Sequence, residues 1–431
     1  MTFSRFFYSV SFYLLSPIIL LRLLYRARRA PAYARRWAER FGFVAEATGN
    51  KTIWLHSVSV GETLAAVPLV KALQQRYPDH RLMVTCMTVT GSERIRAAFG
   101  DTVNHSYAPY DMPDSVERFL NRVQPSILII METELWPNTI AACCSRNIPV
   151  ILANGRLSAK SAAAYSKISR LVRPMLWSMS AVVAQHADDG ARFTQLGLPD
   201  KALTISGNIK FDLHLNSEVQ AKAQSMAVQW RGDNQRPVLL AASTHPGEDE
   251  LILQAFGQIK AALAVKPLLV LVPRHPERFN DVAQLCEQAG CRLARRSAEQ
   301  STAEADILLG DTMGELMAFY GACDLAFVGG SLVPVGGHNM IEPAAWGVPI
   351  ISGPQLFNFA EASRLLIEGD AMVVCEDAQS LAQQSIGLLT NPQRRTQMGA
   401  AARHIAEANR GALERLLAVI DHQLQLLAIG Q

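Results

Sequence analysis

The sequence predicts an α/β fold made of two doubly wound domains that face a cleft. Short apolar segments alternate with amphipathic helical patterns from residue 52 onward, and this alternation is typical of a parallel sheet covered on both faces. The chain has 431 residues, which is enough for two domains of ordinary size. In such sheets ligands bind beyond the carboxyl ends of the strands. We therefore expect the functional residues in the loops that follow the strands.

The N-terminal residues 1–40 form a separate segment that is partly apolar and strongly basic. Phe6–Leu21 contains no charged residue, and eight arginines against Glu39 give residues 1–40 a charge of +7, while the rest of the chain sums to −4. As a helix, this apolar run would reach about 24 Å, somewhat less than a hydrocarbon core of about 30 Å. Three arrangements stay open: a helix that spans the membrane, a helix that lies among the headgroups, and a buried core helix.

The first two arrangements predict a membrane anchor at residues 1–40. Arginines beside an apolar helix bind anionic lipids, and the positive-inside rule places them on the cytoplasmic side. We therefore expect the two domains on the cytoplasmic face of a membrane, with anionic lipids as partners of the basic segment.

The first domain is expected over residues 41–211, and its strands are short runs rich in Ile, Leu and Val. The candidate strands are 52–56, 82–86, 127–131, 149–153, 181–184 and 203–206. Residues 212–236 are polar, so we expect a linker there. The second domain, residues 237–431, has candidate strands at 237–242, 268–272, 306–309, 324–328, 348–351 and 371–374. Helical patterns then close the chain at about 377–390, 393–409 and 411–427.

Composition and missing motifs exclude several classes of protein. With 49% hydrophobic and 18% charged residues, the chain is not intrinsically disordered, and a net charge of +3 gives no reason to expect a nucleic-acid partner. The seven cysteines include no Cys-x-x-Cys pair, which argues against a zinc site. Neither Gly-x-Gly-x-x-Gly nor the P-loop motif occurs, so a dinucleotide dehydrogenase and a P-loop NTPase are disfavoured.

The loop after the first strand supplies the candidate catalytic residue, Glu62. A carboxylate at the mouth of a cleft could accept a proton from an attacking hydroxyl. The spacing Ser59-x-x-Glu62 also fits a capping box, in which the glutamate binds the first turn of its own helix. The spacing leaves both roles open.

Three further polar residues follow strands of the first domain. Glu132 lies shortly before Pro137, a pattern that also suits the start of a helix. Arg156 could hold a phosphate or a carboxylate, or it could be solvated. Lys210 adds a second basic residue close to the expected linker.

Loops of the second domain suggest an anion site. Ser243 and Thr244 precede a helical pattern and offer hydroxyls and free N–H groups. Arg274 follows the next strand and adds a guanidinium to the same rim.

The most informative segment of the second domain runs from Gly329 to Glu342. Gly329 and Gly330, and a second glycine pair before His338, free the backbone for close approach of a ligand. The helix expected to begin near Met340 would direct its positive end at a phosphate. Glu342, in its first turn, could accept both hydroxyls of a ribose. These features suggest group transfer from a nucleotide-activated donor.

Seven stretches of the sequence closely resemble the 3-deoxy-D-manno-octulosonic acid (Kdo) transferase family, in order along nearly the whole chain. The stretches are Ser57–Thr63, Met131–Asn138, Ser243–His245, Pro273–Phe279, Gly310–Leu316, Phe327–Leu332 and Gly336–Asn339. The resemblance implies the GT-B glycosyltransferase architecture of two Rossmann-like domains, with the acceptor bound by the first and the donor by the second. It implies inverting transfer of Kdo from CMP-Kdo to the lipid A precursor lipid IVA at the inner membrane, without a metal or other cofactor.

The resemblance also assigns roles to individual residues. Glu62 matches the general base of the family. The matches to its CMP-binding segments are Pro273 and Arg274, Met313, Gly314 and Glu315, and Asn339, Met340, Ile341 and Glu342. Two alternatives stay open: a nucleotide-sugar 2-epimerase of the same fold or another membrane-associated glycosyltransferase, and a membrane-tethered binding protein without catalysis.

Overall fold

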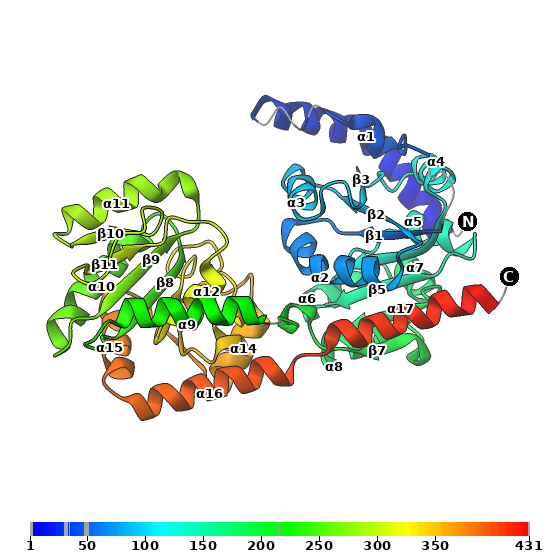
Figure 1. Cartoon of the computed structure of the whole chain (residues 1–431). Coiled ribbons are helices and arrows are strands. Elements are labelled where there is room, and N and C mark those ends of the chain that lie inside the picture. Colours follow the sequence, from blue (N-terminus) through cyan, green and yellow to red (C-terminus); the bar gives the residue numbers. More distant parts are fainter. Residues whose placement is uncertain (1–2, 30–32, 34, 47–50, 214, 430–431) are drawn as a thin grey trace. The chain divides into compact units, whose positions relative to one another are not determined.

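The computed structural model describes residues 3–29, 33, 35–46, 51–213 and 215–429, and the chain divides into two compact units. Unit 1 comprises Met1–Asp212 and Arg410–Gln431, and unit 2 comprises Leu213–Asn409. Each unit contains one seven-stranded parallel sheet covered by helices (Figure 1). This arrangement confirms the predicted α/β class and the two sheets.

The sheet of unit 1 has the strand order β3-β2-β1-β4-β5-β6-β7. Its strands are β1 (Thr52–His56), β2 (Arg81–Cys86), β3 (Asn104–Tyr107), β4 (Pro125–Met131), β5 (Val150–Gly155), β6 (Ala181–Ala184) and β7 (Leu203–Ile205). All of them pair in parallel, and β1 lies between β2 and β4. The direction of winding therefore reverses at β1 and β4, which is where a doubly wound sheet places its ligand site.

Helices cover both faces of this sheet. They are α2 (Val60–Arg76), α3 (Val89–Phe99), α4 (Pro113–Val123), α5 (Pro137–Cys144), α6 (Ala159–Ser166), α7 (Ser169–Trp177), α8 (Ala187–Gln195) and α17 (Ala412–Ile429), with 3-10 turns η2 (Trp37–Phe41), η3 (Asp200–Ala202) and η4 (Ile209–Phe211). Successive strand residues point to opposite faces. Ile53 and Leu55 join one core with α2, α3 and α17, and Trp54 joins the other with α4, α5, α7 and α8.

The sheet of unit 2 repeats the plan with the order β10-β11-β9-β8-β12-β13-β14. Its strands are β8 (Val238–Thr244), β9 (Leu268–Pro273), β10 (Leu293–Arg295), β11 (Ile307–Leu309), β12 (Leu325–Val328), β13 (Ile350–Ser352) and β14 (Met372–Val374). Its helices are α9 (Ser217–Arg231), α10 (Glu248–Ala262), α11 (Phe279–Gln288), α12 (Leu316–Ala322), α13 (Ile341–Trp346), α14 (Ala360–Glu368), α15 (Ala378–Leu389) and α16 (Pro392–Ala408), with the 3-10 turn η5 (Pro276–Arg278).

Two of the expected domain boundaries need correction. Residues 212–236, expected as a linker, contain α9, which packs on α12 and buries Trp230 against Phe319. The final helix, expected in the second domain, belongs to unit 1, where Leu416 and Ile420 of α17 join the core beside α2. An amphipathic pattern shows that a helix has an apolar face but does not show which sheet that face covers.

The N-terminal apolar segment forms the helix α1 (Phe3–Arg29) in unit 1. In Figure 1 its ribbon changes direction part-way along, which fits the proline at position 17 inside the helix. Among the described residues, α1 is the one helix long and apolar enough to cross a membrane. Most of its large apolar side chains are exposed, so the core-helix alternative does not hold.

Candidate active site

Glu62 lies in the first turn of α2, at the carboxyl end of the central strand β1. The Glu62 N–H donates to Ser59 Oγ (3.2 Å), and its carboxylate accepts N–H groups from Val58 (2.7 Å) and Ser59 (3.2 Å). The predicted capping box is therefore present. These contacts hold the carboxylate in one place and leave the side chain 8% exposed.

Two more carboxylates act on Glu62 electrostatically. Burial raises the pKa of Glu62 above its usual range, the hydrogen bonds from Ser59 and Val58 lower it, and the charge of Glu132 raises it. The pKa of Glu134 is raised to about 7, first by burial and then by Glu62 and Glu132. Sequence reasoning missed Glu134 as a site residue, although it lies two positions after Glu132 in the same loop.

Glu132 and Lys210, both candidate site residues, lie close together in the structure. Lys210 Nζ lies 3.2 Å from Glu132 Oε1, and Glu132 has a left-handed backbone with φ +55°. Asn154, buried at the end of β5, accepts the N–H of Ile209 through Oδ1 (3.1 Å) and so fixes the turn that carries Lys210. Asn154 is a positioning residue that sequence reasoning did not identify.

Arg156 follows Asn154 and Gly155 but does not join the carboxylate cluster. Its backbone is tied to Thr133, whose hydroxyl donates to the Arg156 carbonyl, while its side chain is exposed. The guanidinium therefore borders the end of β5 and faces solvent.

In unit 2, a buried carboxylate occupies the glycine-rich loop after β12. Glu248, fully buried at the start of α10, accepts N–H groups from Gly330 (2.7 Å), Ser331 (2.9 Å) and Leu332 (2.9 Å). It also accepts the N–H of His245 (2.9 Å). The N–H of Gly330, a candidate for close approach of a ligand, is thus engaged within the protein.

The glycines of this loop are explained by close packing of the chain on itself. A Cβ on Gly329 would lie 2.7 Å from the Ser243 carbonyl oxygen, and Gly330 has φ +69° next to the His338 ring. Thr244 donates its hydroxyl to Asp249 (2.6 Å), so this candidate also has an internal partner. Glu248 was not predicted, because an acid in the first turn of a helix is common and its burial depends on which loops meet.

Three histidines and two arginines form an electropositive cluster at the carboxyl ends of β8, β9 and β12. His245 Nε2 lies 2.8 Å from His338 Nε2, and the ring centroids of His245 and His275 are 5.4 Å apart. Burial, followed by the charge of Arg274, lowers the pKa of His338 to about 4. Burial, followed by the charges of His275, Arg278 and Arg274, lowers the pKa of His245. His245 and His338 are therefore harder to protonate than a free imidazole, and Arg278 is paired with Asp249. The guanidinium of Arg274 is the group of the cluster that is suited to an anion.

Arg274 follows the buried Pro273 at the end of β9 and links this cluster to the start of α13. Glu342 is partly buried there, and its carboxylate accepts an amide hydrogen of Asn339 (3.1 Å). Burial raises the pKa of Glu342 to about 6, and Asn339 and Arg274 lower it. Asn339 and Glu342 thus offer polar side chains beside Arg274.

Met340 and Ile341 differ from their neighbours in this segment. Met340 is 0% and Ile341 1% exposed, and Met340 packs in the core with Ala344. These two candidates can present only backbone groups to a ligand.

In the candidate loop Met313–Glu315, one side chain is held by ion pairs and the other two residues are exposed. Glu315 makes hydrogen-bonded ion pairs with Arg296 (2.8 Å) and Lys222 (2.8 Å), and these contacts, Arg296 first, lower its pKa to about 2. Met313 is 67% exposed, and Gly314 has φ +83°. The carboxylate of Glu315 anchors the loop, while Met313 and Gly314 remain accessible.

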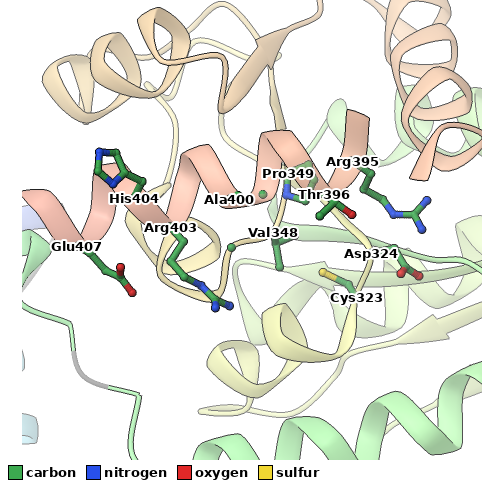
Figure 2. Close-up of a pocket in the computed structure, with 12 residues that line it drawn as sticks. Cys323, Asp324, Val348, Pro349, Arg395, Thr396, Ala400, Arg403, His404 and Glu407 are labelled. Carbon is green, nitrogen blue, oxygen red and sulfur yellow. The ribbon is translucent and has the colours of Figure 1, made fainter. Parts of the chain in front are cut away.

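A hollow of about 460 Å³ in unit 2 does not coincide with these residues. Figure 2 shows that α16 lines it with Arg395, Arg403 and His404, opposite Asp324 and Val348. Asp324 and Val348 precede β12 and β13, so the hollow lies at the amino ends of the strands. Within the described residues, no group of three or more His, Cys, Asp or Glu side chains is placed to hold a metal ion.

Comparison with known proteins gives one consistent family. The model of the family described as 3-deoxy-D-manno-octulosonic-acid transferase (kdotransferase) matches residues 35–213. A 3-deoxy-D-manno-octulosonic acid transferase of Haemophilus influenzae is 45% identical over 98% of this chain and 99% of its own. The transferase of the same name from Bordetella pertussis is 38% identical over 95% of this chain and 97% of its own.

Solved structures show the fold. UDP-GlcNAc 2-epimerase from Neisseria meningitidis is 12% identical, with a TM-score of 0.56 over 86% of this chain and 99% of its own. MurG from Acinetobacter baumannii is 14% identical, with a TM-score of 0.56 over 86% of this chain and 100% of its own. The two parallel-sheet units therefore have the GT-B architecture.

Proposed function

This chain belongs to the 3-deoxy-D-manno-octulosonic acid transferase family, and from that premise we propose that it transfers Kdo from CMP-Kdo to the lipid A precursor lipid IVA. An acceptor hydroxyl attacks the anomeric carbon of Kdo, the bond from that carbon to the phosphate oxygen breaks, and CMP leaves. Attack opposite the leaving group inverts the anomeric centre.

Glu62 is the general base of the proposed reaction, and its geometry is the observation that carries the assignment. Its carboxylate is fixed at the carboxyl end of β1 by two backbone N–H groups. Burial and the Glu132 charge raise its pKa, which makes it a stronger base than a solvated carboxylate. It takes the proton of the acceptor hydroxyl as the new bond forms.

The electropositive cluster of unit 2 receives the nucleotide. Arg274 and the amino end of α13 stabilise the negative charge that grows on the CMP phosphate as it leaves. Asn339 and Glu342 hold the ribose hydroxyls, and the accessible loop at Met313 and Gly314 borders the nucleotide. These groups supply the charge compensation without a metal or other cofactor.

The epimerase alternative draws no support beyond the shared fold, because its solved examples are only 12–14% identical to this chain. Nucleotide preference tests the proposal directly. CMP should raise the melting temperature of the purified protein, UDP should not, and Arg274→Ala should lose the CMP effect. Stabilisation by UDP alone would overturn the assignment of the donor.

The family and the exposed apolar helix α1 are consistent with membrane association. Of the two membrane arrangements, we infer that α1 lies among the headgroups of the inner membrane's cytoplasmic leaflet. Ser9 Oγ lies 3.0 Å from Asn138 Nδ2, Tyr13 donates its hydroxyl to Asp114, and Leu23 packs on unit 1. These contacts extend along the helix, and a helix that crossed the bilayer would have to give them up.

A further inference from the structure

Besides the N-terminus, unit 1 has a second basic segment. No Asp or Glu occurs in residues 135–187, and the basic residues of this stretch are Arg146, Arg156, Lys160, Lys167, Arg170 and Arg173. Four of them, from Lys160 onward, belong to α6, α7 and the turn between them. This concentration of one charge on two short helices favours an anionic partner.

The two helices expose these charges. No residue of α6 is buried, and α7 buries only Val172, Met175 and Leu176. The opposite face of α7 carries Arg170, Arg173 and Trp177, spaced as one face of a helix requires. Trp177 is 67% exposed, whereas tryptophan is highly buried on average.

The exposed face of α7 is hollowed, and no ion pair within the described part of the chain engages its arginines. A hollow of about 370 Å³ is lined by Ser169, Arg170, Arg173, Pro174 and Trp177. The stem of Arg173 packs on Gly197, where a Cβ would lie 2.5 Å from Arg173 Cγ. Among the residues that the structure describes, no ion pair engages the guanidinium of Arg170 or of Arg173. Both are free to bind a phosphate.

The helix that carries this face is a neighbour of the N-terminal helix. α7 packs against α1 (Figure 1), and the exposed side chains of α1 include Phe3, Phe6, Phe7, Leu14 and Leu15. Apolar side chains beside arginines and a tryptophan are the composition that proteins place at the boundary between acyl chains and headgroups. The charge of the face and its nearness to α1 therefore both indicate a lipid surface.

We propose that the α6–α7 face, defined by Lys160, Lys167, Arg170, Arg173 and Trp177, binds the anionic phospholipid headgroups of the bilayer on which α1 lies. The inference rests on the proposed membrane association. Trp177 sits at the headgroup level and the guanidiniums pair with lipid phosphates. Unit 1 would then contact the bilayer through both α1 and the α6–α7 face, and these two contacts would determine which side of the unit faces the membrane.

The test compares two double variants of the full chain. Arg170→Gln/Arg173→Gln removes two charges from the α6–α7 face, and the matched control Lys266→Gln/Arg394→Gln removes two exposed charges from unit 2. Binding is measured by flotation with vesicles of phosphatidylcholine containing 30% phosphatidylglycerol, and with phosphatidylcholine alone. Melting temperature and turnover in detergent are recorded for each protein.

We expect the α6–α7 variant to bind the anionic vesicles about 25-fold more weakly than wild type, at about fivefold per arginine. The difference should shrink on neutral vesicles and in high salt, and the control should match wild type. Unchanged binding of the α6–α7 variant would overturn the inference while leaving the proposed function intact. A raised KM for lipid IVA in detergent with unchanged vesicle binding would assign the arginines to the acceptor's phosphates instead. Failure of wild type itself to bind vesicles would overturn both the inference and the proposed membrane association.

Discussion

At the scale of single residues, Glu62 forms the capping box and is also the general base that we propose, two roles that the sequence left as alternatives. A cap normally holds a carboxylate ionised, whereas burial opposes ionisation. The net effect is a fixed carboxyl group whose pKa lies above that of an exposed glutamate.

The two roles of Glu62 can be separated by a pair of variants. Glu62→Gln should lower turnover by about 10²–10⁴-fold, the usual range for a general base, while CMP affinity stays near wild type. Ser59→Ala breaks the cap and keeps the carboxylate, so it should cost about 1 kcal/mol of stability and only a small factor in turnover. Steady-state kinetics and urea unfolding measure both. Equal loss of turnover in the two variants would show that the cap alone matters.

Glu134 should make stability depend on pH. Its pKa is raised to about 7 in the folded state and is about 4.3 when unfolded, so the folded protein binds more protons between these values. Its contribution is therefore complete below pH 4.3 and is lost as pH rises through 7. Glu134→Gln should flatten the fall in unfolding free energy between pH 5 and pH 8. Urea unfolding at each pH measures this free energy. If it fell equally steeply with pH in the variant and in wild type, the raised pKa of Glu134 would be contradicted.

The capping box could be predicted from the sequence because its signal is local. Ser59-x-x-Glu62 contains both its cap and its candidate base within four positions. Glu134 and Glu248 were missed because their importance comes from partners distant in sequence: Glu62 in one case, and the amides of residues 330–332 in the other. No local pattern distinguishes such a residue from an ordinary acid at a loop or helix start.

At the scale of elements, Glu248 ties three parts of unit 2 together. It joins the start of α10, the backbone of His245 and the loop after β12. Each of its contacts is a hydrogen bond from a backbone N–H to a charged acceptor, which is stronger than a neutral one. The positions of His245 and His338, and hence the shape of the electropositive cluster, depend on this carboxylate.

Glu248→Gln should therefore destabilise unit 2 and loosen the proposed CMP site. The amide NH₂ would face a backbone N–H, which leaves buried groups unsatisfied at a cost of about 2–3 kcal/mol. We expect a lower melting temperature and weaker CMP binding by calorimetry. Glu250→Gln, an exposed neighbour on the same helix, is the matched control. Wild-type stability in Glu248→Gln would refute the anchoring role.

Strands were predicted from runs of apolar residues, so strands with few apolar residues were missed. All twelve expected strands correspond to observed strands. The two that were missed, β3 and β10, are the first strands in their sheet orders. Edge strands have one neighbour instead of two and need fewer apolar residues, and Asn104–Tyr107 reads Asn-His-Ser-Tyr.

At the scale of the whole molecule, the chain forms two units of similar topology, and its last helix, α17, packs in unit 1. Asp212 accepts the N–H groups of Gly411 and Leu413, so the end of the first segment caps the start of α17 within unit 1. This placement of α17 could not be predicted, because the pattern of residues 411–427 fits either sheet. It makes the stability of unit 1 depend on both ends of the chain.

We propose that unit 1 carries the general base and unit 2 the nucleotide site of a Kdo transferase. The most direct measurement incubates detergent-purified protein with CMP-Kdo and lipid IVA and determines the mass of the lipid product. We predict a lipid heavier by one or more Kdo units from wild type and none from Glu62→Gln, although that variant still binds CMP. An unmodified lipid from folded, CMP-binding wild-type protein would contradict the proposed transfer, and a heavier lipid from Glu62→Gln at the wild-type rate would contradict the role of Glu62 as base.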